Sequence, residues 1–317
     1  MWRNSSMKIT KKIEPRAKIK VVVGSNFSIE TDPMLPKLHQ LCCLFSRKGT
    51  FKTTAITNLM RMYREGNPSS VDRIIWVSPG TAQSNKELID QLKIHPDDFL
   101  DPDMPGCVKH IQKILEDERD DFVAWKYYNK NFDKVMKDMK MGKPIGDDFL
   151  MSYFDVSSNS FRRPAPKYEC YRKYDRGATV SVIFDDNLGS KLMSDKSLVK
   201  LAQSHRHQAP YEEGGALGVS LYFLVQSFKS AGWMNGKTIR SNSSMFMVGK
   251  TKDADELKEI ASSCAGIIEP EVFYEVYHEA TKDSPHDFLM VDLHKKDNHP
   301  SPFRKNFDTF LIVDGVK

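Results

Sequence analysis

The sequence predicts an α/β fold in which a mostly parallel central sheet is flanked by helices. Short apolar runs of strand length alternate along the chain with segments whose apolar residues recur at helical spacing. One unit, residues 41–63, joins an apolar strand to a helix through a short polar turn. A β-branched strand at 179–184 ends directly in two aspartates, at the edge where α/β folds bind their ligands. These patterns together predict a ligand site at the carboxyl edge of the sheet.

The unit at 41–63 has three parts. The apolar run 41–45 predicts a buried strand, and residues 46–51 form a turn. Lys52 opens a helix, and Gly66 ends it. The apolar residues that share one face of this helix are Ile56, Leu59, Met60 and Tyr63.

This arrangement is typical of a phosphate-binding loop. Backbone N–H groups of such a turn, and of the helix that follows it, surround the phosphates. The Lys52 ammonium would reach the β and γ oxygens, and the Thr53 hydroxyl would ligate magnesium. The candidate nucleotide-binding residues are Ser46, Arg47, Lys48, Gly49, Thr50, Phe51, Lys52, Thr53 and Thr54.

Two residues depart from the usual pattern G-x-x-x-x-G-K-[ST]. Ser46 stands at the first glycine and Phe51 at the second, while Gly49 supplies some freedom between them. A side chain at position 51 is expected to crowd the backbone near the phosphates. The alternative interpretation is an ordinary strand–turn–helix with a lysine on its surface.

Composition sets broad limits. The chain has 317 residues, of which 40% are hydrophobic and 28% charged, as in a soluble globular protein of one large or two small domains. Its net charge of +5 is compatible with an anionic partner. Five cysteines without a CxxC pair argue against a disulfide framework and for a reducing compartment such as the cytoplasm. We expect no membrane span and no secretory signal.

The remaining elements follow from apolar periodicity and turn residues. The predicted strands are 73–77, 179–184, 219–225, 244–248, 288–291 and 310–313. The predicted helices are 108–128, 194–204, 253–264 and 271–280, and residues 231–242 are predicted to be a loop. The acidic run 116–121 is expected to form a solvated helix face.

Two basic segments raise the question of nucleic-acid binding. Residues 1–20 form a basic arm, for which a disordered tail is favoured over a nucleic-acid contact. Residues 161–176 interleave Arg and Lys with three tyrosines, a composition that suits backbone contact and base stacking. An equally open interpretation is a surface loop whose tyrosines pack on the body of the protein.

The polar residues after two strands extend the candidate site. Asp185 can hold a magnesium ion opposite Thr53, and Asp186 can orient or deprotonate an attacking water. Gln226, at the tip of the next strand along the chain, could touch the γ-phosphate or its water. The alternatives are a simple Asp-Asp turn and a strand-end amide that faces solvent.

The order of these segments resembles a known family. The apolar strand leading into SRKGTFKTT is followed by DRIIWVSP, VSVIFDD, LAQSHRH, GVSLYFLVQS and KTIRSNSSMFMV. The set is similar to the packaging ATPases of double-stranded DNA viruses, the A32-like branch of the FtsK–HerA superfamily found in large DNA viruses and virophages. The resemblance covers about residues 37–292 and, weakly, the tail FRKNFDTFLIV.

The resemblance implies a RecA-like P-loop NTPase of the additional-strand (ASCE) type that uses ATP and Mg²⁺. Lys52 and Thr53 would be the loop lysine and the magnesium-ligating hydroxyl, with Asp185 supporting the metal. Asp186 would take the catalytic carboxylate position, and Gln226 would be the γ-phosphate sensor. The candidates for an arginine finger that reaches a neighbouring subunit are Arg206 and, second, Arg240.

The expected layout is a basic arm at 1–20 and a single ATPase domain at 21–317, with an irregular insertion near 129–178 and a C-terminal extension at 265–317. The implied function is a motor that translocates double-stranded DNA into a preformed capsid. The implied partners are DNA, a capsid or vertex protein, and further copies in a ring of five or six, located in the virion or the viral factory. The alternatives are a non-catalytic scaffold protein with a degenerate loop, and another P-loop enzyme such as a helicase.

Overall fold

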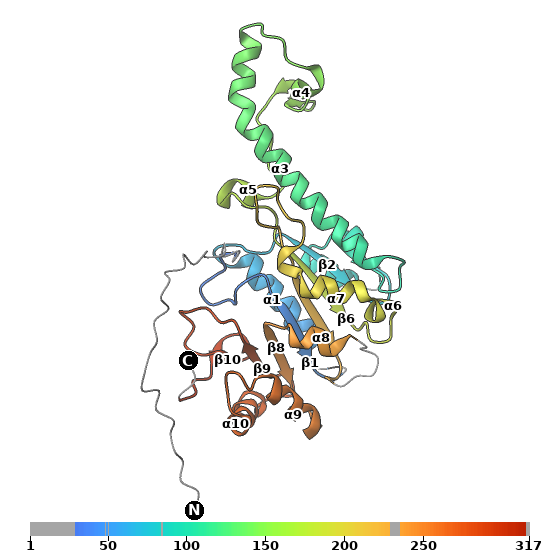
Figure 1. The fold of residues 1–317 in the computed structure, drawn as a ribbon, viewed down its shortest axis with the longest axis vertical. Coiled ribbons are helices and arrows are strands. Elements are labelled where there is room, and N and C mark those ends of the chain that lie inside the picture. The colour runs from blue at the N-terminus through green and yellow to red at the C-terminus, as the bar shows by residue number, and fades with distance from the viewer. Residues whose placement is uncertain (1–28, 48, 50, 84, 229–234, 315–317) are drawn as a thin grey trace, which may run out of the picture.

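The computed structural model describes residues 29–47, 49, 51–83, 85–228 and 235–314. In this part of the chain one nine-stranded sheet has the order β11-β10-β9-β8-β1-β7-β6-β2-β3 (Figure 1). The strands are β1 (Leu41–Phe45), β2 (Arg73–Val77), β3 (Phe99–Leu100), β6 (Val180–Asp185), β7 (Ser220–Val225), β8 (Met245–Gly249), β9 (Phe288–Asp292), β10 (Phe303–Lys305) and β11 (Thr309–Phe310). The predicted basic arm at 1–20 lies outside the described residues.

The strand order confirms the predicted fold class. From β8 to β3 all neighbouring strands are parallel, and β9, β10 and β11 extend the sheet with antiparallel pairs. Strand β7 lies between β1, which leads into the candidate phosphate loop, and β6, which ends at Asp185. This inserted strand is the feature that defines the additional-strand type. The carboxyl ends of β1, β7 and β6 therefore meet at one edge of the sheet.

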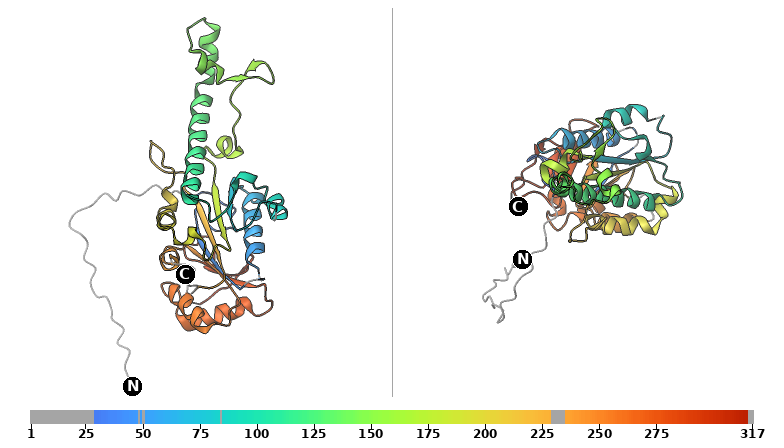
Figure 2. Two further views of the ribbon diagram at one scale, coloured as in Figure 1. Left: turned by 90° about the vertical axis from the view of Figure 1, so that its right-hand side faces the viewer. Right: turned by 90° about the horizontal axis from the view of Figure 1, so that it is seen from above.

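Helices cover both faces of the sheet (Figure 2). The α-helices are α1 (Lys52–Glu65), α2 (Lys86–Leu92), α3 (Cys107–Lys140), α4 (Asp147–Met151), α5 (Glu169–Tyr174), α6 (Lys191–Ser194), α7 (Lys196–Gln203), α8 (Gly236–Ser241), α9 (Ala254–Ser263) and α10 (Pro270–Thr281). Residues of β1 alternate between two cores, as the pleat of a strand requires. Cys42 and Leu44 pack with α1 and α2, whereas Leu41, Cys43 and Phe45 face the core shared with α3, α7, α9 and α10.

Three sequence predictions need correction. The helix predicted to end at residue 128 continues to Lys140, because Phe132 and Val135 keep the helical spacing and the intervening lysines are good helix formers. Residues 129–140 of the predicted irregular insertion are therefore helical. The predicted loop at 231–242 contains α8 in its second half, and of the strand predicted at 310–313 only Phe310 belongs to a strand, β11. The short strand β10 was not predicted.

The distal half of α3 projects from the body as an arm, together with α4 and a hairpin of β4 (Phe154–Asp155) and β5 (Ser160–Phe161) (Figures 1 and 2). Aromatic rings pack the arm against itself. Tyr153 is buried and contacts Tyr128, Phe132 and Phe149, with ring centroids 5.6–5.7 Å apart. The arm therefore has a small core of its own.

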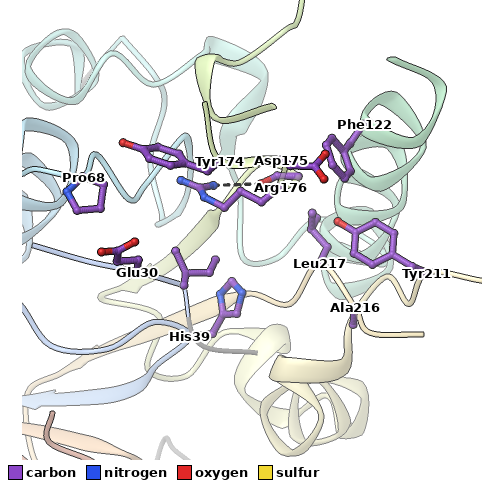
Figure 3. A pocket seen from close by; sticks show the side chains of 12 residues that line it. Glu30, His39, Pro68, Phe122, Tyr174, Asp175, Arg176, Tyr211, Ala216 and Leu217 are labelled. Carbon is purple, nitrogen blue, oxygen red and sulfur yellow. Dashed lines mark hydrogen bonds between the residues drawn. The ribbon is translucent and has the colours of Figure 1, made fainter. Parts of the chain in front are cut away.

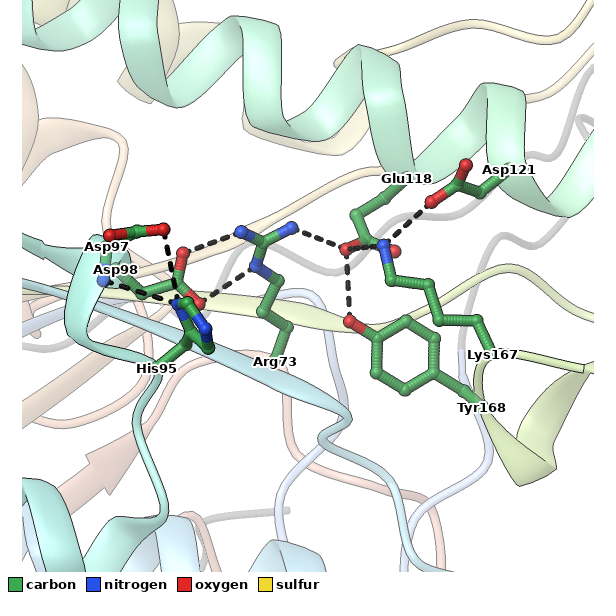
Figure 4. Close-up of polar contacts among 8 residues, drawn as sticks. All are labelled: Arg73, His95, Asp97, Asp98, Glu118, Asp121, Lys167 and Tyr168. Atoms are coloured by element: carbon green, nitrogen blue, oxygen red, sulfur yellow. Dashed lines mark hydrogen bonds and ion pairs between the residues drawn. The ribbon is translucent and has the colours of Figure 1, made fainter.

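A buried carboxylate attaches the base of the arm to the sheet (Figure 4). Glu118, within the predicted solvated run, is fully buried. It accepts hydrogen bonds from Arg73 Nη1 at 2.5 Å, Lys167 Nζ at 2.9 Å and the Tyr168 hydroxyl at 3.0 Å. Arg73 also binds Asp98 through two nitrogens, at 2.6 and 3.0 Å. The prediction that the whole acidic run is solvated was wrong for Glu118, whose partners are distant in sequence.

Four of the six basic side chains in the segment at 161–176 form ion pairs with carboxylates of the same chain. Arg163 binds both oxygens of Asp133 at 2.7 Å, and Arg176 binds Asp72 at 2.7 Å. Tyr171 is buried against the arm. These contacts favour the interpretation of a surface loop with packed tyrosines over that of a nucleic-acid contact.

Candidate nucleotide-binding site

The candidate loop leaves the carboxyl end of β1 and enters α1 at Lys52. At its start, the Ser46 amide donates to the carbonyl of Val225 at 3.2 Å, so the loop is attached to the end of β7. Gly49 adopts a positive φ of 75°, a conformation that favours glycine. Arg47, Gly49 and Thr54 are exposed. Lys48 and Thr50, which were also predicted to bind nucleotide, lie outside the described residues.

Lys52 is at the centre of this loop. Its buried ammonium donates to the carbonyls of Ser46, at 2.8 Å, and Arg47, at 3.0 Å. Burial lowers the pKa of Lys52, and the nearby carboxylates of Asp185 and Asp186 act in the opposite direction. The side chain thus lies across the loop, within electrostatic reach of both aspartates.

Thr53 and Asp185 meet at the edge of the sheet. The Thr53 hydroxyl donates to Asp185 Oδ2 at 3.1 Å, although the residues are 132 positions apart. Burial raises the pKa of Asp185 to about 6, while the hydrogen bond from Thr53 and the charge of Lys52 lower it. A hydroxyl and a carboxylate are hard oxygen donors, the ligands that Mg²⁺ takes from proteins. The pair therefore fits the predicted magnesium site.

Asp186 and Gln226 are also brought together. Gln226 Nε2 donates to Asp186 Oδ1 at 2.7 Å, across the ends of the paired strands β7 and β6. Asp186 has a positive φ of 54°, an uncommon conformation for a residue other than glycine. Aspartate adopts this conformation more readily than most residues, and here it accompanies the turn that follows β6.

The structure does not show the expected crowding by Phe51. Its ring lies in the core, 4% exposed, and stacks on Phe288 with centroids 4.6 Å apart and planes 9° apart. Gly249, the last residue of β8, provides the space: a Cβ there would lie 2.3 Å from Phe51 Cε1 and 2.6 Å from Ser46 Oγ. The two departures from the usual loop pattern, Ser46 and Phe51, thus both contact one glycine. The sequence interpretation missed Gly249, although a glycine directly after the apolar run 244–248 was a visible signal.

Neither candidate arginine finger lies beside Lys52 in the same chain. Arg206 is exposed on a 3₁₀ turn, His205–His207. The His205 carbonyl accepts a hydrogen bond from the amide of Val219, the residue just before β7. This is the amino edge of the sheet, opposite the candidate site, and Arg206 there contacts His294 Nδ1 at 3.1 Å. Arg240 donates to the carbonyl of Phe228 at 2.6 Å and packs over its ring. The arginine-finger role of either residue stays a prediction.

A separate cavity of about 420 Å³ opens at the amino edge of the sheet (Figure 3). Its lining includes His39, Phe122, Arg176, Tyr211 and Leu217. Burial lowers the pKa of His39 to about 3, so this imidazole is neutral. The cavity is not part of the phosphate-loop site, because it lies at the other end of the strands.

The strand order and the strand–loop–helix unit define the chain as a P-loop NTPase fold of the additional-strand type. No protein-family model matches the sequence, and no curated protein matches it. Within the described residues, no helix has both the length and the apolar character needed to cross a membrane.

Three solved structures are similar in overall shape. The genome packaging NTPase B204 from Sulfolobus turreted icosahedral virus 2, in complex with AMP, has a TM-score of 0.41 and 11% identity, covering 86% of this chain and 98% of that one. EssC (ATPases 2 and 3) from Geobacillus thermodenitrificans has a TM-score of 0.37 and 15% identity, covering 70% and 34%. The pCW3 conjugation coupling protein TcpA has a TM-score of 0.35 and 13% identity, covering 80% and 58%. The internal topology, rather than these scores, defines the fold.

Proposed function

We propose that this protein is an ATP-hydrolysing motor that moves double-stranded viral DNA into a preformed capsid. The observation that supports ATP hydrolysis best is the convergence of Lys52, Thr53 and Asp185 at the carboxyl edge of the sheet, beside the Asp186–Gln226 pair. Five polar side chains thus lie at the carboxyl ends of β1, β6 and β7, where groups that neutralise phosphate charge and orient a water are needed for phosphoryl transfer.

Each residue has a role in this proposal. The Lys52 ammonium neutralises charge on the β and γ phosphates of ATP, and the loop amides hold their oxygens. Thr53 and Asp185 would hold Mg²⁺, which when bound neutralises the charge that develops on the phosphate oxygens. Asp186 orients the attacking water and accepts its proton, and Gln226 fixes the Asp186 carboxylate through its hydrogen bond.

The alternative of a non-catalytic scaffold protein loses its structural reason. That alternative assumed that Phe51 blocks the loop, whereas the ring is packed in the core against Phe288. The alternative of another P-loop enzyme can be distinguished from the motor by measuring whether ATP hydrolysis depends on double-stranded DNA.

The DNA-translocating part of the proposal rests on the ordered segments that the chain shares with viral packaging ATPases. It includes a ring of five or six copies, in which Arg206 or Arg240 of one subunit completes the site of the next. It also includes a capsid or vertex partner and a location in the virion or the viral factory, consistent with five buried, free cysteines.

The test is ATP hydrolysis by the full chain with and without double-stranded DNA. We expect DNA to stimulate hydrolysis, and Lys52→Ala to lower the rate by on the order of 10²–10³-fold. Lys258→Ala, an exposed lysine on α9, is the matched control and should keep the rate. Equal rates for wild type and Lys52→Ala would refute an ATPase site here, and hydrolysis indifferent to DNA would refute the motor.

A further inference from the structure

The exposed face of the arm carries a row of lysines. Lys126, Lys130, Lys134, Lys137 and Lys140 follow one another at spacings of three or four residues on α3, and all five are exposed. Residues at these spacings lie above one another on the same side of a helix. We call this set the lysine row.

Four of the five ammonium groups are unpaired. Lys126 binds Asp175 at 2.9 Å, whereas Lys130, Lys134, Lys137 and Lys140 make no ion pair or hydrogen bond with any residue that the structure describes. The two carboxylates of the same stretch are engaged by other cations. Asp133 binds Arg163 and Asp138 binds Lys143, both at 2.7 Å.

The charge changes sign along the helix. Residues 107–121 contain five acidic and three basic side chains, whereas residues 126–140 contain two acidic side chains and five lysines. Like charges one turn apart destabilise an isolated helix. The row thus has fewer acidic neighbours than the first half of α3, where Lys113 forms an ion pair with Asp117 at 2.8 Å.

The orientation of the row is fixed by the opposite face of the helix. Trp125 donates to the carbonyl of Pro164 at 3.2 Å, Phe132 contacts Tyr153, and Val135 is buried. The lysines therefore point away from the arm's own core, and the arm projects beyond the rest of the protein (Figures 1 and 2). The row is an accessible and mainly basic surface, in which the one exposed carboxylate within residues 126–140, that of Asp133, is paired with Arg163.

The partner that fits such a row is a regular polyanion. At a rise of 1.5 Å per residue, the row spans about 21 Å, and its ammonium groups recur about once per helical turn of 5.4 Å. One strand of duplex DNA places a phosphate every 3.4 Å or so along its axis, so the row would face about six phosphates. Lysine binds phosphate as a point charge, without reading bases.

We propose that the lysine row binds the phosphate backbone of double-stranded DNA. The identity of the polyanion rests on the proposed motor function, whereas the presence of an anionic partner rests on the arm alone. The basic segment at 161–176 would not share this role, because Arg163, Lys167 and Arg176 are held by carboxylates of the same chain.

The test compares three full-length variants with the wild type. The first changes Lys130, Lys134, Lys137 and Lys140 to Gln, which keeps helix propensity and removes four charges. The second changes the same residues to Arg and keeps the charge. The third, a matched control, changes four exposed lysines elsewhere to Gln: Lys109, Lys196, Lys200 and Lys258. Binding of a labelled duplex is measured over a series of salt concentrations, and ATP hydrolysis is measured without DNA.

We expect the row variant to lower the slope of log K against log salt by about 3.6, since each phosphate contact contributes about 0.9. The decrease in the salt slope should be the same for duplexes of unrelated sequence. The Arg variant and the control variant should keep the slope, and all three should keep DNA-independent hydrolysis.

Other outcomes would overturn the proposal. An unchanged slope in the row variant, with altered self-association or altered binding to a capsid protein, would mean that the row meets an acidic protein surface. An equal decrease of the salt slope in the control variant would mean that DNA binding depends only on the total charge of the protein and not on the lysine row. Failure of the wild type to bind duplex DNA would also overturn it. Absence of ATP hydrolysis in the wild type, with the slope change intact, would instead refute the proposed enzyme and leave the DNA contact standing.

Discussion

Gly249 makes the unusual phosphate loop possible, and Gly249→Ala tests this directly. The new Cβ would lie 2.3 Å from Phe51 Cε1, 2.6 Å from Ser46 Oγ and 2.9 Å from Ser46 Cβ. Carbon atoms in contact are normally about 3.5–4.0 Å apart, so the neighbours must move by about 1 Å or more. The Phe51 ring has little freedom to do so, because it is stacked on Phe288.

Two effects should follow from Gly249→Ala. Overpacking of a dense core costs about 1–3 kcal/mol, which lowers the melting temperature by several degrees in a chain of this size. Displacement of Ser46 also shifts the carbonyl that holds the Lys52 ammonium at 2.8 Å. A misplacement of about 1 Å in a catalytic site can lower the rate 10²-fold, so we expect kcat/KM for ATP to fall by on the order of 10–100-fold.

The assay combines thermal unfolding and ATP hydrolysis for Gly249→Ala, Phe51→Ala and the double variant. Phe51→Ala alone loses ring packing, but it removes the shortest contact of the new methyl group and leaves the contacts with Ser46, so the double variant should be less destabilised than the sum of the single variants by about 1 kcal/mol. Gly266→Ala is the control, because a Cβ there meets no atom within 4 Å. If Gly249→Ala and Gly266→Ala had the same melting temperature and rate of hydrolysis, the Cβ at position 249 would not crowd the loop. The same conclusion would follow if the losses of stability caused by Gly249→Ala and Phe51→Ala were additive.

Three further predictions concern the site and the base of the arm. The pKa of Asp185 is raised to about 6 in the folded protein, so the folded protein binds a proton at this carboxyl group more tightly than the unfolded chain does. The free energy of unfolding should therefore fall by about 3 kcal/mol as pH rises from about 4 to about 6. Asp185→Asn should abolish this dependence in denaturant titrations, and a pH profile that survives the substitution would contradict the assignment. Binding of Mg²⁺ with ATP should release protons below pH 6, so the observed heat should differ between buffers of different ionisation enthalpy, and equal uncorrected heats in all buffers would count against Asp185 as a ligand. Glu118→Ala should lower stability by about 1–3 kcal/mol, since it removes the fully buried carboxylate that Arg73, Lys167 and Tyr168 share, whereas the exposed Asp121→Ala should lower it by less than about 1 kcal/mol. Equal unfolding midpoints for these two variants would show that the Glu118 network does not hold the arm.

The sequence was sufficient for the elements that are bounded by strong local signals. The apolar runs 41–45 and 73–77 match β1 and β2 residue for residue, because polar turns flank both. The meeting of Thr53 with Asp185 could also be predicted, since the carboxyl ends of parallel strands share one edge. The burial of Lys52 speaks against the alternative of a lysine on an ordinary surface, and its role in binding phosphate stays a prediction.

Other features depended on contacts between distant segments. The direction of the Phe51 ring is set by Gly249 and Phe288, about 200 residues further along the chain, and no local pattern encodes it. Burial of Glu118 depends on Arg73 at the start of β2 and on Lys167 beyond the arm. The extension of α3 was missed because its distal half is rich in lysine, so its apolar positions are too few to dominate the pattern.

The length of α3 has a mechanical consequence. The helix has 34 residues and is therefore about 51 Å long. Its beginning lies near the carboxyl edge of the sheet, where Asp103 accepts a hydrogen bond from the Lys191 amide, and its end lies beyond the amino edge. Beyond Glu118, where the helix is held to the sheet, the last 22 residues or so form a rod about 33 Å long, and a tilt of about 6° at its base moves its tip by about 3.5 Å. That displacement is close to the ~3.4 Å rise of one base pair, so in the motor that we propose a small tilt at the base of the arm would move the lysine row by about one base pair.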